Sequence, residues 1–286
     1  MSRNSGRLRG KRVLVTGSGT GIGSGIALEF AHQGADVVVH FSHNGKGARG
    51  VAKEIRAVGR RSTAFKTDFD RLDEVVELGE RAVAFLGGID ILVNNSGICL
   101  NKPFLEAKPE WFDLLYHVNI RAQYFLTQRI VRDVLLRGAG AVCNITSIHG
   151  LSGAPEHSIY AGTKGAIIAY TRALGVELAH KGIRVNAIAP GWVNVEGYYQ
   201  AVPGFNEKEA AKAAMDKVPR GPRRQKIRHR QARRLPLLRG RRLHSRPDDR
   251  LRRGHLFTHV ADLRFQKSIH REMGDRLCAG HLRILG

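Results

Sequence analysis

Short apolar runs alternate with longer amphipathic stretches along the first two thirds of the chain. Each apolar run is continuous, which is typical of a parallel strand buried on both faces. The sequence predicts strands at 11–16, 35–41, 61–65, 89–93, 141–146 and 183–188. It predicts helices after residue 23, at 47–58, 72–86, 109–116 and 118–137, and from Tyr160 to about His180. This order predicts one α/β domain with a doubly wound parallel sheet of the Rossmann type, which binds ligands at the carboxyl ends of its strands.

A glycine-rich turn comes directly after the first strand and directly before a helical pattern. It reads Thr16-Gly17-Ser18-Gly19-Thr20-Gly21-Ile22-Gly23. Glycines allow the backbone to approach a pyrophosphate closely, and the free N–H groups at the start of the helix then face the phosphates. A tight turn alone would also use glycines, but the strand before it and the helix after it favour a dinucleotide site.

The end of the second strand bears on which dinucleotide binds. Many dinucleotide folds place a carboxylate there, where it accepts hydrogen bonds from the adenosine ribose. Here the segment reads His40-Phe41-Ser42-His43-Asn44, without an acidic residue. A 2′-phosphate would therefore meet no negative charge, so we predict NADP in preference to NAD. Candidate phosphate partners are Ser18, Ser42 and His43.

A serine, a tyrosine and a lysine follow the fifth predicted strand. Tyr160 and Lys164 are four residues apart, so a helix projects both from one face. A phenol ordinarily titrates near pH 10, and an adjacent ammonium favours its phenolate, which makes Tyr160 a candidate general acid or base. Ser147 is placed to hold a substrate oxygen. The Tyr160–Lys164 pair alone is a weak signal, because a solvated helix face produces the same spacing.

Four signals together resemble the short-chain dehydrogenase/reductase family in its single-domain Tyr-x-x-x-Lys form. They are the glycine turn, Asn94-Asn95-Ser96-Gly97, Ser147 with the 160–164 motif, and Pro190-Gly191 after the sixth strand. The match covers residues 8–218, which we expect to form one NAD(P)-binding catalytic domain. The resemblance implies an oxidoreductase that uses NADP or NAD to interconvert a secondary alcohol and a ketone.

The resemblance also implies a role for each matching residue. Ser147 would orient the substrate oxygen, and Tyr160 would exchange the proton. Lys164 would bind the nicotinamide ribose and assist Tyr160, while Asn119 would hold a water next to Lys164. No metal is implied. The cofactor would lie against Tyr160, Lys164 and a larger set: Gly17, Ser18, Thr20, Gly21, Ile22, Gly23, Asp68, Phe69, Asn94, Ser96, Gly97, Pro190, Gly191 and Val193.

The substrate and one unusual position stay open. Ser96 stands where the family usually has alanine. His149 and His157 flank the motif and are candidates to line the substrate pocket, although a loop histidine is more often a polar surface residue. The resemblance admits 3-oxoacyl thioesters, sugars, polyols and steroids as substrates. His149 and Asn101-Lys102 lean toward a polar one.

The pattern breaks after residue 218. Residues 219–286 hold 20 of the 47 lysines and arginines but only 5 of the 25 acidic residues, so most of the net charge of +22 lies there. When the reading frame is shifted by one nucleotide from about Pro222, allowed codons let residues 229–253 decode as a helix, a turn and a strand that resemble the family's C-terminal segment. We therefore hypothesise a frameshift product, poorly ordered, with the last strand missing. The sequence of the gene tests this hypothesis.

Two alternatives for residues 219–286 are a disordered tail without a partner and, less favoured, an arginine-rich arm for nucleic acid. The second would make the chain a Rossmann protein with impaired catalysis that binds nucleic acid. No apolar run is long enough to span a membrane and the N-terminus lacks the core of a signal peptide, so we expect a cytoplasmic protein. The resemblance implies a homodimer or homotetramer, whose assembly and solubility a missing last strand would impair.

Overall fold

The computed structural model describes residues 6–135, 138–191, 193 and 283–285. All of them belong to one compact unit of the chain. The predictions for the arginine-rich segment, its boundary at residue 218 and its origin in a frameshift fall outside these residues, apart from 283–285. They remain predictions.

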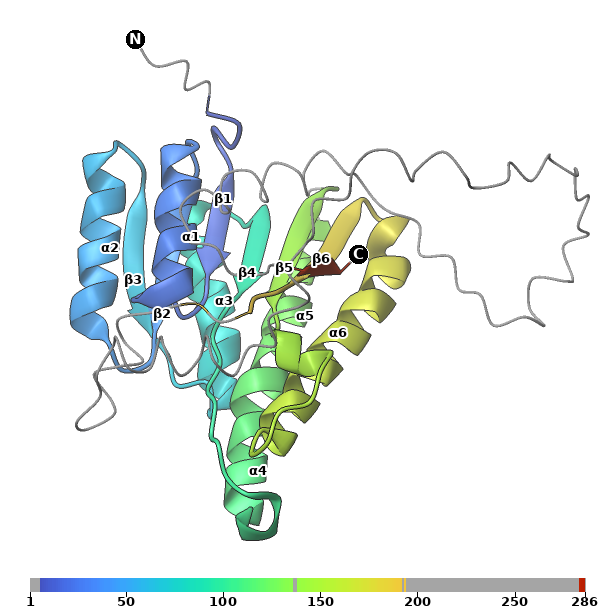
Figure 1. The fold of residues 1–286 in the computed structure, drawn as a ribbon. Helices are drawn as coiled ribbons and strands as arrows, with labels where there is room; N and C mark the ends of the chain where they lie inside the picture. The colour runs from blue at the N-terminus through green and yellow to red at the C-terminus, as the bar shows by residue number, and fades with distance from the viewer. Residues whose placement is uncertain (1–5, 136–137, 192, 194–282, 286) are drawn as a thin grey trace, which may run out of the picture. The chain divides into compact units, whose positions relative to one another are not determined.

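The described strands form one sheet in the order β3-β2-β1-β4-β5-β6-β7, as Figure 1 shows. Strand order reverses between β1 and β4, and this reversal is the position at which ligands bind in open α/β sheets. The chain therefore has the predicted fold, a doubly wound parallel sheet. The parallel strands are β1 (Arg12–Val15), β2 (Asp36–Phe41), β3 (Ser62–Lys66), β4 (Ile91–Asn94), β5 (Gly140–Ile145) and β6 (Ile183–Ala189).

The edge of the sheet beside β6 carries only a short strand. β7 (Arg283–Leu285) pairs antiparallel with β6, with Ala189 opposite Arg283 and Ala187 opposite Leu285. We expected the last strand of the parallel sheet to be missing or disordered, and the parallel strands of the described sheet do stop at β6. The structure differs from the expectation in one respect: β7 pairs antiparallel with β6 and occupies part of its edge.

Helices cover both faces of the sheet, and each face has its own apolar core. One core joins two helices to every second strand residue, such as Val13 and Val15, while the other joins three helices to the intervening ones, such as Leu14 and Leu92. This alternation follows from the two-residue period of a strand. The first layer holds α1 (Gly21–His32) and α2 (Gly45–Ala57), and the second holds α3 (Leu72–Leu86), α5 (Ala122–Leu135) and α6 (Ser158–Ala179).

One predicted helix differs in a way that matters for the site. We predicted a continuous helix over 118–137, but α4 (Pro109–Tyr116) is followed by a π-helical turn, His117–Arg121, and α5 begins only at Ala122. Single π turns inside helices often occur at functional sites. This turn carries Asn119. Two short 3₁₀ turns, Phe104–Glu106 and Ile148–Gly150, complete the described elements.

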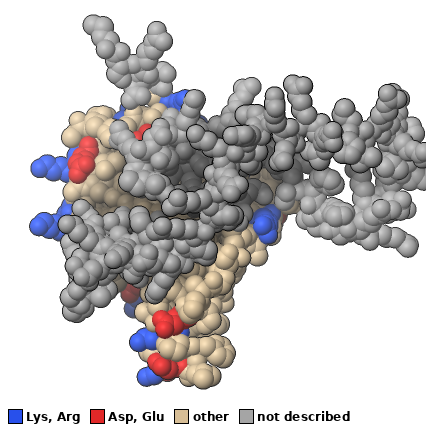
Figure 2. Space-filling model, viewed as in Figure 1, with Lys and Arg blue, Asp and Glu red and all other residues tan. Residues whose placement is uncertain are grey.

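The helices and the charges of the described residues bear on the membrane and nucleic-acid hypotheses. None of the described helices combines the length and apolar character that crossing a bilayer requires. On the face shown in Figure 2, the lysines and arginines of the described residues are scattered and mixed with acidic side chains. Most of the basic excess in the sequence, +15 of +22, lies in residues 219–286, and residues 1–218 carry the remaining +7.

Candidate active site

The glycine turn between β1 and α1 has the shape that a pyrophosphate needs. Gly17 and Gly21 have φ of +60° and +58°, a conformation that favours glycine. A Cβ on Gly23 would collide with the carbonyl oxygen of Gly17, so the turn and the helix start pack tightly. Within the described structure, Thr20 forms no side-chain cap and the first turn of α1 carries no acidic residue. The positive end of this helix therefore fits an anionic dinucleotide.

The segment after β4 supports this turn through Asn95. The Asn95 side-chain amide donates to the carbonyl oxygens of Thr16 and Gly17, each at 3.0 Å. The main-chain N–H groups of Asn95 and Ser96 donate in turn to the hydroxyl of Thr16, at 2.9 and 3.0 Å. Two loops that the sequence separates by almost eighty residues are thereby fixed together.

Asn94, which the family resemblance placed along the dinucleotide, has its side chain elsewhere. It is fully buried, and its amide donates to Thr127 and to Asn144, both at 2.8 Å. Side chains alternate along β4, so Asn94 shares the face of Leu92, against α5 and α6. Only the main chain of Asn94 is left to line a dinucleotide.

Two other predicted cofactor residues use their side chains inside the protein. The buried hydroxyl of Ser18 donates to the carbonyl oxygen of Val15 at 2.6 Å and accepts from the main-chain N–H of His40 at 3.1 Å. The Phe69 ring is 2% exposed and stacks on the His40 ring with centroids 4.4 Å apart. Neither side chain is available to a phosphate or an adenine, so both act as supports. Thr20, His43 and Asp68 are exposed at the same end of the sheet.

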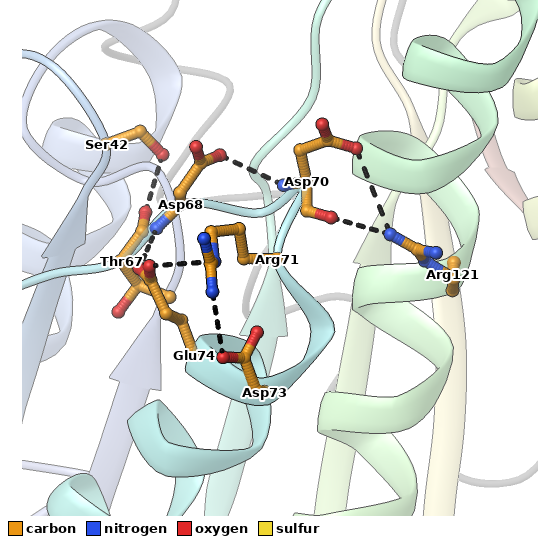
Figure 3. Close-up of polar contacts among 8 residues, drawn as sticks. All are labelled: Ser42, Thr67, Asp68, Asp70, Arg71, Asp73, Glu74 and Arg121. Atoms are coloured by element: carbon orange, nitrogen blue, oxygen red, sulfur yellow. Dashed lines mark hydrogen bonds and ion pairs between the residues drawn. The ribbon is translucent and has the colours of Figure 1, made fainter.

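The loop after β3 is held by a network of charged groups, shown in Figure 3. The main-chain N–H of Asp68 donates to Glu74 at 2.9 Å, and that of Asp70 donates to Asp68 at 3.0 Å. Arg121 donates to the carbonyl oxygen of Asp70 at 2.6 Å, and Nδ1 of His117 lies 2.8 Å from the carboxylate of Asp70. Arg121 and His117 are the two ends of the π turn. The network therefore connects the predicted adenine loop to the element that carries Asn119.

Ser147 follows β5 directly, and the Lys164 side chain reaches the same end of β5 from α6. Ser147 is 8% exposed and its hydroxyl accepts from the main-chain N–H of His149 at 3.2 Å. Lys164 is 4% exposed; its ammonium donates to the carbonyl oxygen of Ile145 at 3.1 Å and lies 5.6 Å from the centroid of the Tyr160 ring. The structure thus places the ammonium beside the tyrosine, one helical turn away, as the spacing predicts.

Burial makes Lys164 an unusual lysine. Loss of hydration lowers its pKa from 10.5 to about 8. A Cβ on Gly97 would lie 3.3 Å from its nitrogen and 3.2 Å from the side-chain oxygen of Asn119, so both groups lie next to Gly97. Asn119 accepts from the N–H of Ile98 at 2.8 Å and donates to Thr163 at 3.1 Å. It thereby joins the loop after β4 to α6.

The remaining predicted residues follow β6. Pro190 is buried and its carbonyl oxygen accepts from the N–H of Ile148 at 3.1 Å, so the loops after β5 and β6 are joined. Gly191 and Val193 come next and are half-buried. In the described residues, no three His, Cys, Asp or Glu side chains group as metal ligands would.

The two loop histidines lie against Tyr160. The rings of His149 and His157 are 4.5 Å apart, and each centroid lies 6.2 Å from that of Tyr160, with the rings edge to face. Burial and the neighbouring His157 lower the pKa of His149. The three rings form one aromatic cluster beside Ser147, which we call the imidazole cluster.

Sequence reasoning missed His40 and Asn95 as parts of the site. His40 is 1% exposed and lies on the face of β2 that also carries Val38. The available signal was a lone histidine inside an otherwise apolar run. Asn95 gave no signal of its own, because only the structure shows which of two adjacent asparagines turns toward Gly17.

Comparisons with known proteins point to one family. A family model described as short chain dehydrogenase matches residues 11–202. The hydroxynaphthalene reductase-like protein Arp2 of Metarhizium robertsii is 43% identical over 192 residues, covering 67% of this chain and 71% of its own length. Versicolorin reductase 1 of Dothistroma septosporum is 35% identical over 198 residues, covering 69% of this chain and 75% of its own. A short chain dehydrogenase from Burkholderia cenocepacia J2315, solved in complex with NADP, matches with a TM-score of 0.66 and 32% identity, covering 72% of this chain and 82% of its own.

The chain belongs to the short-chain dehydrogenase/reductase family. It is an oxidoreductase with a Rossmann fold, and its cofactor is NADP or NAD. The glycine turn and the uncapped start of α1 fit the pyrophosphate of that cofactor.

Proposed function

We propose that this chain reduces a ketone on a hydroxylated, fused aromatic ring system, with NADPH as the reductant. The observation that carries the substrate class is the imidazole cluster beside Ser147. Aromatic rings attract a flat aromatic ligand through stacking and edge contacts, and imidazole nitrogens pair with phenolic hydroxyls. Relatives named as a hydroxynaphthalene reductase-like protein and as a versicolorin reductase, 43% and 35% identical, support the same class.

In the proposed reaction the protein supplies orientation and one proton. Bound NADPH supplies the hydride that forms the new C–H bond. The Ser147 hydroxyl donates a hydrogen bond to the substrate carbonyl oxygen. Tyr160 gives its phenolic proton to that oxygen as the C=O double bond becomes a C–O single bond, so the product is the alcohol. Lys164, charged below its pKa of about 8, stabilises the tyrosinate left behind.

The route by which Tyr160 regains its proton is part of the proposal. Asn119 lies in the π turn beside Lys164 and holds the segment at Ile98. We assign it a water that passes a proton from solvent to the ammonium and on to the tyrosinate. The cofactor contacts proposed for the turn at Gly17–Gly23, for Asp68 and for the segment after β6 follow the family pattern.

The test is an assay of the full chain for loss of NADPH absorbance with a panel of carbonyls. The panel contains hydroxylated tetralones, a 3-oxoacyl thioester, a ketose and acetoin. We expect the highest kcat/KM for the tetralones. A second chain, in which residues from 222 onward are replaced by the shifted reading frame, is assayed beside it. If either chain prefers the thioester or the ketose, the aromatic substrate class is wrong.

A variant separates recognition by the imidazole cluster from general activity. Replacing both histidines, as His149→Ala with His157→Ala, should lower kcat/KM for the tetralones by about tenfold and leave that for acetoin within about twofold, because only a flat ligand stacks on the rings. An equal loss for both substrates would mean that the histidines only support the loop. A nucleic-acid function rests on residues that the structure does not describe, and nothing in the described residues favours it.

A further inference from the structure

His40 connects the three loops that would surround the cofactor. Its main chain pairs with Ser18, as N–H donor at 3.1 Å and as carbonyl acceptor at 2.9 Å. One ring nitrogen, Nδ1, lies 3.0 Å from the N–H of Gly17, and the other, Nε2, lies 3.2 Å from the carbonyl oxygen of Thr67. Gly17 belongs to the loop after β1, Thr67 to the loop after β3, and His40 itself lies one residue before the end of β2.

These contacts determine the protonation state of the ring. The N–H of Gly17 can only donate, so Nδ1 must carry a lone pair and the proton must sit on Nε2, where it bonds to the Thr67 carbonyl. The ring is therefore neutral and in a single tautomer. A protonated imidazole would place a second N–H against that of Gly17 and push the turn away.

Ser96 gives the second observation. Its hydroxyl lies 3.2 Å from the same Nδ1, so Ser96 and Gly17 approach one lone pair from two different loops. The space around it is full, since a Cβ on Gly17 would lie 2.9 Å from the Ser96 hydroxyl oxygen. Ser96 is the position at which the family pattern usually has alanine. The serine here has a partner that an alanine would lack.

We propose that neutral His40 and Ser96 act together as positioning residues that hold the Gly17 turn in the geometry that binds the NADPH pyrophosphate. Neither side chain need touch the cofactor. This inference rests on cofactor use alone and does not depend on the substrate proposed above.

The experiment measures the Kd of NADPH by fluorescence titration of full-length variants, together with Tm. His40→Phe keeps the ring and its stacking on Phe69 but removes both nitrogens, whereas His40→Asn keeps an acceptor near the position of Nδ1. We expect the Kd to rise about tenfold for His40→Phe, the equivalent of one net hydrogen bond, and to stay within about threefold for His40→Asn. Ser96→Ala should raise it about threefold.

A double variant tests whether the two residues act as a unit. In the His40→Phe background, Ser96→Ala should add no further loss, because the acceptor for the hydroxyl is already gone. Ser62→Ala is the matched control, since its hydroxyl is buried in the neighbouring strand without a recorded partner and should leave the Kd unchanged.

Three results would overturn the proposal. They are an unchanged Kd in folded His40→Phe, a full additive loss in the double variant, and an unchanged Kd in Ser96→Ala. The third result decides the matter even if His40→Phe fails to fold. A merely structural role would lower Tm in these variants without changing the Kd of the folded protein. Wild-type chain that binds no NADPH would instead count against the cofactor assignment.

Discussion

The two halves of the sheet each bury a nitrogen base, but the two bases differ in charge: His40 is neutral and Lys164 is protonated near neutral pH. At the ends of β1, β2 and β3, His40 is 1% exposed, and burial lowers its pKa from 6.5 to about 4, so it is neutral. At the ends of β4, β5 and β6, Lys164 is 4% exposed, and burial lowers its pKa only to about 8, so it is charged near neutral pH. Both shifts have the same cause, which is loss of hydration.

The difference follows from what each half has to do. His40 must accept a hydrogen bond from a main-chain N–H, which only a neutral ring can do. In the proposed mechanism Lys164 presents a positive charge to Tyr160, and the fold tolerates the cost of burying it. A pKa shift from 10.5 to about 8 corresponds to about 3 kcal/mol against folding at neutral pH. At neutral pH the buried charge of Lys164 therefore costs stability, whereas the neutral His40 ring carries no such cost.

Removing the phenol from the catalytic half should have the largest effect. Tyr160→Phe deletes the proton donor, so kcat should fall by about 10³-fold, within the range known for general acid catalysis. The Kd for NADPH should stay within about twofold, because phenylalanine keeps the ring that lies against the cofactor and the Gly17–Gly23 turn is untouched. Steady-state kinetics and fluorescence titration measure the two quantities. Tyr170→Phe is the control, as this tyrosine lies on the same helix and bonds to Gln123 away from Ser147. Equal losses of kcat in both variants would contradict the assignment of Tyr160.

Replacing the buried charge should separate activity from stability. Lys164→Met should lower kcat by about 10²-fold and raise Tm at pH 7, because it removes an ammonium that burial disfavours. The pH dependence of unfolding tests whether burial of this charge costs stability. Between about pH 8 and pH 10.5 the unfolded wild-type chain holds more protons at this lysine, so wild-type stability rises with pH, and the variant should lack that rise. A lower Tm for the variant at pH 7 would show that the Ile145 hydrogen bond outweighs the cost of burial.

The sequence predicted the strands and helices of both halves better than it predicted the side-chain contacts between them. Continuous apolar runs identify buried parallel strands, and the Tyr160–Lys164 spacing identifies a shared helix face, because both depend only on local periodicity. The roles of Asn94 and Asn95 depend on where a strand ends, to within one residue. The π turn at Asn119 depends on bonds to Ile98, far along the chain. Such long-range contacts leave no periodic signal in a single sequence.

Acid should weaken the binding half through His40. The unfolded chain protonates this histidine near pH 6.5 and the folded chain only near pH 4, so stability should fall as the pH drops from 6.5 to 4. Each ring contact recorded in the structure is with an uncharged group: the Gly17 N–H, the Thr67 carbonyl, the Ser96 hydroxyl and the Phe69 ring. His40→Phe should therefore show a flatter plot of unfolding free energy against pH, by up to about 1.4 kcal/mol per pH unit. Denaturant unfolding at several pH values measures it, and parallel plots would refute it.

The smallest effect should come from the charged network that connects the two halves. Asp70→Asn removes the carboxylate that forms an ion pair with Arg121 at 3.9 Å and lies 2.8 Å from His117, but it keeps the carbonyl oxygen that Arg121 uses. These side chains are partly exposed, and exposed ion pairs contribute little, so kcat should change by no more than about twofold at low salt. The change should vanish at high salt, where screening removes the pair in the wild type as well. Glu77→Gln, which loses an exposed pair with Arg81 on α3, should show no change at either salt concentration. A large effect of Asp70→Asn that persists in salt would mean that the π turn transmits structure between the halves and that they are not independent.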